Sequence, residues 1–290
     1  GLPSLEIAGG VCDIVKWVLA LAAALMLVTP ASIAQAADSV PVKGADASWP
    51  NCPKGMGIPS RKSKGLPMPA KDAKFVILGL TNGPGFYPNP CLQSQVNWAR
   101  TRGMWVGTYA MTTYPKPAQL RTYGQSGPWA PNTRSNRLRN AGYAQAQFNL
   151  ATMDRVGLSK EFMWVDVEPY EVAPWSSSRT RNKAVLDGVL KGYRDAGVAT
   201  GFYTSPGPWQ DIIGSARYGL PEWRTAGGHP WSDTGYPDAR RMCSVSSVQG
   251  GPILVAQWWD TKRDHDLLCP RARTATTVER MFTWMSLEAS

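Results

Sequence analysis

The sequence predicts an α/β fold, namely a (β/α)8-type TIM barrel that is irregular because it has fewer helices than strands. Short runs of β-branched and aromatic residues recur along the chain, and segments with helical spacing separate several of them. About eight such runs fall within some 250 residues, enough to close a barrel. Strands that alternate with helices imply a parallel sheet, and the chemistry of such a barrel lies at the carboxyl ends of its strands. The length of 290 residues also fits two small domains.

The individual elements follow from local patterns. Strands are expected at 44–48, 75–80, 104–110, 162–168, 200–205, 220–226, 253–259 and 264–268. Helices are expected at 91–103, 138–157 and 179–197. Each of these helices closes at a glycine, the residue that most readily ends a helix. The connections 112–137 and 227–250 are rich in Gly, Pro, Ser and Trp, and loops of such length are usually functional or mobile.

The amino-terminal segment 1–37 reads as a signal peptide. Residues 17–37 carry no charge, and their strongly apolar part is shorter than the roughly 20 residues that span a bilayer. Ala34-Gln35-Ala36 has the form of a cleavage site. We therefore expect a secreted protein in which residues 38–290 form a single barrel domain. An uncleaved membrane anchor is the alternative.

The first residues fit a signal peptide poorly, because Glu6 and Asp13 are acidic where such a segment is normally basic. Our hypothesis is that translation starts at Val15, which leaves 1–14 as an untranslated leader. That start removes Cys12 from the mature chain.

Four cysteines then remain, Cys52, Cys91, Cys243 and Cys269. An even number in an exported chain suggests two disulfides. Three pairings are possible, and we expect the most local one, which joins Cys52 to Cys91 and Cys243 to Cys269. The spacing matches no CxxC zinc pattern and the chain has only two histidines, so we expect neither a metal nor a cofactor.

The chain is basic, with a formal net charge of +10. An exported basic protein suggests an anionic partner, although the charge could serve solubility alone. Lys and Arg are scattered and no nucleic-acid motif occurs, so nucleic acid is not expected. A bacterial cell wall, with its carboxylates and phosphodiester polymers, fits better, and the protein could associate with it. We expect a monomer without a protein partner.

The stretch FMWVDVEPY places two acids, Asp166 and Glu168, at the end of a predicted core strand. Because side chains alternate along a strand, both acids share a face with Trp164 and point toward the barrel mouth. Asp46 ends the first strand and should face the same mouth. Glycoside hydrolysis needs one protonated acid for the leaving oxygen and one carboxylate for the cationic centre. The alternative is that the two acids form structural hydrogen bonds or salt bridges.

Aromatic side chains near strand ends are candidates for sugar binding. Trp164, Tyr203 and Trp258 could form walls on which the apolar faces of sugars stack, or they could simply fill the barrel.

The order of the motifs DASWPN, FVILGLTNG, VGTYA, WVDVE, GFYTS, AQWW and DHDLL resembles the family 25 glycoside hydrolases, lysozymes with an irregular (β/α) barrel, and their glycoside hydrolase-like relatives in exported bacterial proteins. The resemblance runs from about Gly44 to Pro270. It implies that Glu168 is the general acid, and that Asp166 stabilises the charged intermediate or positions the substrate acetamido group.

The same resemblance extends to further site residues. Asp46 matches an early aspartate-x-serine of the family, and Asp266 matches a late aspartate that helps to close an acidic mouth. Tyr109 and Gln257 lie in matching motifs and are implied to contact substrate. Asn51 stands where the family usually has a glutamine, which bears on the substrate more than on the fold.

The resemblance thus implies an exported hydrolase that cleaves a β-1,4 bond next to N-acetylmuramic acid in peptidoglycan. A barrel that binds wall glycan without turnover, and a hydrolase of another polysaccharide, are the alternatives. Whether the reaction retains or inverts the anomeric centre depends on the separation of the two carboxyls, which a sequence does not contain.

Overall fold

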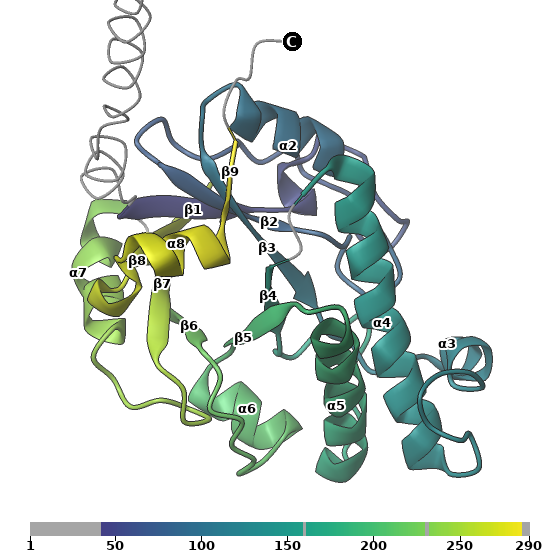
Figure 1. Ribbon diagram of the computed structural model, residues 1–290. Coiled ribbons are helices and arrows are strands. Elements are labelled where there is room, and N and C mark those ends of the chain that lie inside the picture. The colour runs from purple at the N-terminus through teal and green to yellow at the C-terminus, as the bar shows by residue number, and fades with distance from the viewer. Residues whose placement is uncertain (1–41, 159–160, 230–231, 286–290) are drawn as a thin grey trace, which may run out of the picture. The chain divides into compact units, whose positions relative to one another are not determined.

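The computed structural model describes residues 42–158, 161–229 and 232–285, and these form a closed β-barrel surrounded by helices (Figure 1). The strands are β1 Lys43–Ala47, β2 Phe75–Gly79, β3 Trp105–Met111, β4 Phe162–Asp166, β5 Ala199–Tyr203, β6 Glu222–Gly228, β7 Ile253–Trp259, β8 Asp264–Leu268 and the short β9 Thr283–Trp284. The predicted barrel is confirmed. The signal segment, the leader and the start at Val15 lie outside the described residues.

The sheet closes on itself in a regular order. Neighbouring strands follow the order β2-β1-β8-β7-β6-β5-β4-β3, and β2 also pairs with β3. β9 pairs with the first two residues of β3, below the point where β4 begins to pair with it. We call the open end at the carboxyl termini of the parallel strands the mouth.

Among the eight strands that close the barrel, β8 runs against the expectation of a parallel sheet. β8 is antiparallel to both β1 and β7. A tight turn joins β7 to β8, in which the Asp260 carboxylate accepts the backbone N–H groups of Lys262 (2.7 Å) and Arg263 (2.9 Å). Antiparallel strands can follow so short a turn, whereas parallel strands need a long crossover. The mouth end of β8 is therefore its first residue, Asp264, which pairs in register with Asp46.

The helices outnumber those expected from the sequence but are still fewer than the strands. They are α2 Leu92–Arg100, α3 Pro117–Tyr123, α4 Arg134–Val156, α5 Arg179–Asp195, α6 Pro206–Ile212, α7 Ser232–Met242 and α8 Ala275–Met281. The three predicted helices correspond to α2, α4 and α5. α4 begins at Arg134 because the Thr133 hydroxyl caps it, accepting the Asn136 N–H at 3.1 Å. α3 and α7 lie within the two predicted loops, and α7 contains Pro237, which disfavours a helix by pattern.

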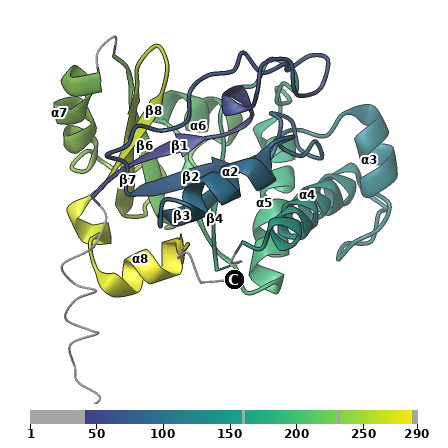
Figure 2. The same ribbon diagram turned by 90° about the horizontal axis from the view of Figure 1, so that it is seen from above.

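The core has two layers that follow from strand alternation. Residues such as Phe75, Trp164 and Trp223 point inward and fill the barrel. Their sequence neighbours, such as Val76 and Val165, point outward beneath α2, α4 and α5. Figures 1 and 2 show α7 on the side of the barrel opposite α4 and α5.

The end of the barrel opposite the mouth is closed by α8. Val278 and Met281 of this helix, with Phe282 after it, join the inner cluster. The Phe282 ring lies 5.1 Å from that of Phe75, at the amino end of β2. Residues of α8 therefore cover the end of the barrel that is opposite the mouth.

Both disulfides have the predicted pairing. Cys52, after β1, is joined to Cys91, the residue before α2. Cys243, after α7, is joined to Cys269, after β8. In the described part of the chain, no helix is both long and apolar enough to cross a bilayer.

Candidate active site at the mouth of the barrel

Acidic side chains gather at the mouth, and four of them were named as candidates from the sequence. They are Asp46 of β1, Asp166 of β4, Glu168 just after β4, and Asp266 of β8. Asp46, Asp166 and Asp266 are 7%, 3% and 0% exposed, whereas Glu168 is half-buried. Among these four, Glu168 therefore combines partial burial with access from outside.

Hydrogen bonds fix two of these carboxyls. Gln257 Nε2 of β7 donates to Asp46 Oδ2 at 2.7 Å, while the Tyr203 hydroxyl of β5 donates to Gln257 Oε1 at 2.8 Å. Trp223 Nε1 of β6 donates to Asp266 Oδ1 at 2.8 Å. Adjacent strands thus supply a polar layer that orients the acids.

Asp166 is held differently. Its Oδ1 atom is buried and accepts no hydrogen bond from any residue that the structure describes. A buried carboxyl that lacks donors is more stable in its protonated form. The protonation state of Asp166 therefore depends on whether the neighbouring carboxyls are charged.

The electrostatics of the cluster favour bound protons. Burial is the largest cause that raises the pKa of Asp46, and the neighbouring Asp266 adds to the rise. Burial also raises the pKa of Asp166, with further contributions from Glu168 and Asp46. Burial raises the pKa of Glu168, and no described Lys or Arg offsets this rise at either Asp166 or Glu168. The two acids are thus not neutralised by a salt bridge.

The backbone around Glu168 is anchored on both sides. Val167 N–H donates to the Tyr203 carbonyl at 3.0 Å, and the Thr204 hydroxyl donates to the Val167 carbonyl at 2.9 Å. Trp175 Nε1 donates to the Glu168 carbonyl at 2.9 Å. These bonds hold Glu168 in place although it follows the last residue of β4.

Tyr109 and Tyr203 lie beside the acids, as expected. Burial is the main cause that raises the pKa of both hydroxyls; Asp46 is the next cause for Tyr109 and Glu168 for Tyr203. Both rings contact Trp223 edge-on, with centroid distances of 5.7 and 4.7 Å. The floor of the mouth is therefore aromatic.

Two other predicted aromatics lie elsewhere, which corrects the expectation that they form sugar-stacking walls. Trp164 is 0% exposed and packs against Phe162 and Trp223 below the acids. Trp258 is on the outer face of β7, where it packs against Tyr236 of α7 and stacks on His265. Neither ring can meet a sugar at the mouth.

Two residues of this region were missed from the sequence. Trp259 shares the inward face of β7 with Gln257, ends that strand and is 38% exposed. Asp264 is level with Asp46, and its pKa is raised by burial, by Asp46, by Asp260 and by Glu168. Side chains on one face of a strand recur every two residues. This spacing places Trp259 on the face of Gln257 and Asp264 on the face of Asp266, and it is the sequence signal that identifies both residues.

Within 42–158, 161–229 and 232–285, no three His, Cys, Asp or Glu side chains are placed to hold a metal ion. The chemistry available at the mouth is acid–base chemistry by carboxyl groups.

Comparisons with known proteins agree with this architecture. A family model described as Lysozyme-like protein 1 matches residues 129–223, less than half of the chain, from just before α4 into β6. A search of curated protein sequences finds no match.

Solved structures give longer matches. A family GH25 lysozyme from Aspergillus fumigatus is 17% identical, with 82% of this chain and 98% of that chain covered and a TM-score of 0.50. A muramidase from Acremonium alcalophilum is 16% identical, with 81% and 99% covered and a TM-score of 0.50. At such identities the likeness concerns the fold, and it agrees with the resemblance read from the motifs: the chain shares the barrel fold of the GH25 lysozymes.

Proposed function

We propose that this protein is an exported glycoside hydrolase that cleaves a β-1,4 bond next to N-acetylmuramic acid in peptidoglycan. The observation that carries the proposal is the carboxyl pair Asp166 and Glu168 at the mouth of the barrel, whose pKa values are raised and are not lowered by any described Lys or Arg. Structural ion pairs would have lowered the pKa of both acids instead.

Glu168 is the proton donor in this proposal. Its raised pKa keeps the acid protonated at a pH where an exposed glutamate has lost its proton. Because Glu168 is half-buried, its carboxyl can reach the glycosidic oxygen of a sugar chain in the mouth. Donation of the proton to that oxygen lets the leaving group depart as an alcohol.

Asp166 supplies the negative charge that the reaction needs. The Glu168 carboxyl helps to raise the pKa of Asp166, so the pair is expected to release its protons in two separate steps. Between these steps one carboxyl is protonated and the other ionised, the state that glycoside cleavage requires. The Asp166 carboxylate then stabilises the cationic centre or positions the acetamido group, while Asp46 adds negative potential.

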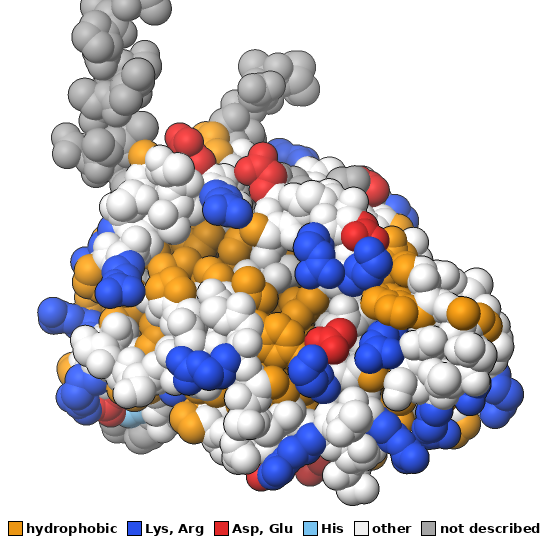
Figure 3. Space-filling model, turned by 60° about the horizontal axis from the view of Figure 1, so that its bottom comes forward, with side chains coloured by type: hydrophobic (Ala, Val, Ile, Leu, Met, Phe, Trp, Pro, Cys, Tyr) orange, Lys and Arg blue, Asp and Glu red, His pale blue; other side chains and the backbone are white. Residues whose placement is uncertain are grey.

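The substrate assignment rests on the surroundings of the acids. Trp259, at the rim, offers an exposed ring on which the apolar face of a sugar can stack. Figure 3 shows Lys and Arg side chains spread over this face, around hydrophobic surface, rather than gathered in one stripe. Such dispersed positive charge suits a bacterial cell wall, whose negative charges are spread over its surface, better than one strand of a nucleic acid. Two disulfides suit an oxidising, extracellular location. The solved structures of similar fold are named lysozyme and muramidase.

The variant Glu168→Gln tests the proposal, because glutamine keeps the size of the side chain but has no acidic proton to donate. We expect the release of soluble fragments from purified peptidoglycan to fall by about 10²–10⁴-fold, the usual contribution of a general acid. Mass spectrometry of the fragments identifies the bond that is cut, by the sugar found at each new reducing end.

Glu171→Gln is the matched control, since Glu171 is exposed on the same loop. It should leave activity unchanged, and both variants should melt at the temperature of the wild type. A wild-type protein that sediments with walls but releases no fragments would instead establish a binding barrel without turnover. Equal activity of Glu168→Gln and wild type would remove Glu168 from the mechanism.

A further inference from the structure

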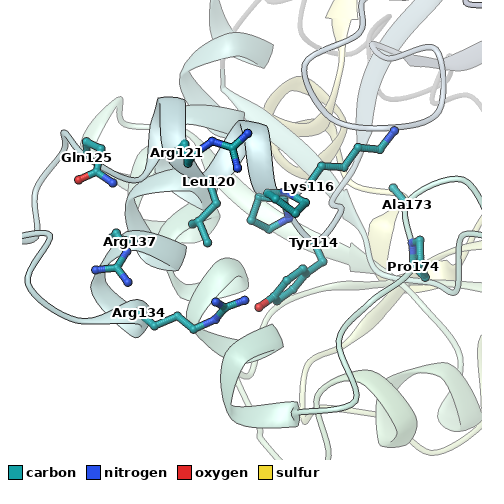
Figure 4. A pocket seen from close by; sticks show the side chains of 11 residues that line it. Tyr114, Lys116, Leu120, Arg121, Gln125, Arg134, Arg137, Ala173 and Pro174 are labelled. Atoms are coloured by element: carbon teal, nitrogen blue, oxygen red, sulfur yellow. The ribbon is translucent and has the colours of Figure 1, made fainter.

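A second pocket, with a cavity volume of about 480 Å³, lies between α3, the start of α4 and the loop that follows Glu168 (Figure 4). We call it the basic pocket. Its functional side chains are Tyr114, Lys116, Leu120, Arg121, Arg134 and Arg137. Ala173 and Pro174, which come five and six positions after Glu168, complete its wall. No acidic residue of the described chain lines it, in contrast to the mouth.

The cations of the basic pocket are not neutralised within the protein. None of Lys116, Arg121, Arg134 and Arg137 forms an ion pair with the part of the chain that the structure describes. Arg137 Nη1 donates to the Pro131 carbonyl at 3.0 Å, which occupies one of the five N–H groups of that guanidinium. Most of the donors therefore remain available to a ligand.

The position of two of these arginines is unfavourable for the helix that carries them. Arg134 and Arg137 lie in the first turn of α4, three residues apart and on one face, so their charges repel. The amino end of a helix is itself positive, and α4 has no acid in its first turn to compensate. An anion bound between the two arginines would offset both penalties.

A buried hydroxyl points into the same space. The Tyr114 oxygen is inaccessible to solvent and has no hydrogen-bond partner among the described residues. Figure 4 shows this hydroxyl directed toward the Arg134 side chain, with Leu120 beside it. A guanidinium has no acceptor, so the donors of both groups converge on a space where an acceptor would satisfy them.

We propose that the basic pocket binds a phosphate group carried by a sugar or polyol. Several donors converge here, and a phosphate offers more oxygen acceptors and more charge than a carboxylate, while arginine binds it through paired N–H groups. The Tyr114 ring and Leu120 provide an apolar surface for the carbon skeleton of the ligand. The inference goes beyond the proposed function, because binding here needs no turnover at Glu168.

The test is titration calorimetry of the full mature chain with sn-glycerol 3-phosphate, with glycerol as the uncharged comparison. We expect the phosphate ester to bind and glycerol not to bind. The double variant Arg134→Gln/Arg137→Gln should raise the Kd by about tenfold or more, because hydrogen bonds to charged groups are strong. Arg240→Gln/Arg271→Gln, which removes the same charge at exposed positions outside the pocket, should bind as the wild type does. Absence of wild-type binding, or equal loss in both double variants, would overturn the proposal.

A second variant separates binding from folding. Tyr114→Phe removes a hydroxyl without a partner, so the melting temperature should not fall, whereas the Kd for glycerol 3-phosphate should rise by about tenfold. A lower melting temperature with unchanged Kd would assign the hydroxyl to the fold and contradict its role. Fragment release from phosphate-free peptidoglycan should be unaffected, which keeps this test independent of the proposed hydrolysis.

The source of the phosphate is decided with cell walls. Loss of arginine-dependent sedimentation after phosphodiester polymers are stripped from the walls would identify these polymers as the ligand. Unchanged sedimentation, with glycerol 3-phosphate still bound, would assign the pocket to free phosphate esters. Arginine-dependent binding of an RNA oligonucleotide that exceeds binding of poly(glycerol phosphate) would contradict a carbohydrate ligand.

Discussion

Asp266 combines full burial with a position beside Asp46 and Asp264. Burial raises the pKa of its carboxyl to about 8. The folded protein therefore binds a proton at Asp266 over a pH range where the unfolded chain, with an ordinary aspartate pKa near 4, has released it. It follows that this group contributes stability below about pH 4, and that the contribution is lost as the pH rises through about 8.

The variant Asp266→Asn tests that titration. Asparagine cannot ionise, but its carbonyl oxygen can still accept the hydrogen bond from Trp223 Nε1. We expect the melting temperature of the wild type to fall by several degrees between pH 4 and 8 and that of the variant to fall less, so that the variant is the more stable protein at pH 9. Differential scanning calorimetry over this range measures the effect. Asp211→Asn, at an exposed position, should follow the wild type, and parallel curves for all three proteins would show that Asp266 does not titrate in this range.

At the residue scale, the sequence predicted the acids better than the aromatic rings. Asp166 and Glu168 follow from alternation within one strand, which needs no knowledge of the partner strands. The position of Asp264 at the mouth depends on the direction of β8, which is antiparallel to β7 because a tight turn at Asp260 joins the two strands. Trp259 was missed because its neighbour Trp258, on the other face of β7, was taken as the candidate for sugar stacking. The basic pocket is formed by α3, the start of α4 and the loop after Glu168, so no single stretch of sequence contains it.

At the element scale, α4 and α5 pack through glycines. A Cβ atom at Gly142 of α4 would overlap the Val185 carbonyl oxygen of α5, and one at Gly188 of α5 would overlap the Arg139 carbonyl oxygen of α4. The backbones therefore touch, with no side chain between them. This close contact fixes α4, whose first turn forms the basic pocket, against α5, which follows the loop of Glu168.

Gly142→Ala tests this contact. Alanine in an ordinary helix position is more favourable than glycine by about 0.8–1 kcal/mol, but here the overlap should outweigh that gain and lower the free energy of unfolding by about 1–3 kcal/mol. Gly207→Ala in α6 is the control, because no atom lies within 4 Å of the added Cβ. We expect its stability to be unchanged or slightly raised. Denaturant unfolding measures both, and equal stabilities of the two variants would contradict the close packing.

The boundaries of the elements show where local patterns suffice. Strands and the helices α2, α4 and α5 follow from periodicity, because their buried faces repeat with the period of the element. α7 was not predicted, since Pro237 and the many polar residues of 227–250 resemble a loop. Packing of Ala239 and Tyr236 against Trp258 provides the tertiary contacts that stabilise this helix in spite of its proline.

At the scale of the whole molecule, one disulfide lies at each end of the barrel. Cys52–Cys91 ties the segment after β1 to the start of α2, on the side of the mouth. Cys243–Cys269 ties the end of α7 to the last residues of β8, which reach the opposite end because β8 is antiparallel. The two bonds close loops of similar length, with sequence separations of 39 and 26. Their effects on stability should therefore be similar, and their effects on the mouth should differ.

Replacement of each pair by serine separates the two effects. Either double variant should lose about 2–4 kcal/mol of unfolding free energy, because the unfolded chain regains the freedom of an open loop. Cys52→Ser/Cys91→Ser should in addition weaken fragment release from peptidoglycan, since the freed loops border Asp46 and the acids beside it. Cys243→Ser/Cys269→Ser should keep its activity at temperatures well below its melting point, because its loop adjoins the end that α8 closes. The comparison is made by activity assays at a temperature where circular dichroism shows that both variants are folded. Equal loss of activity in the two variants would contradict the idea that the Cys52–Cys91 disulfide stabilises the mouth.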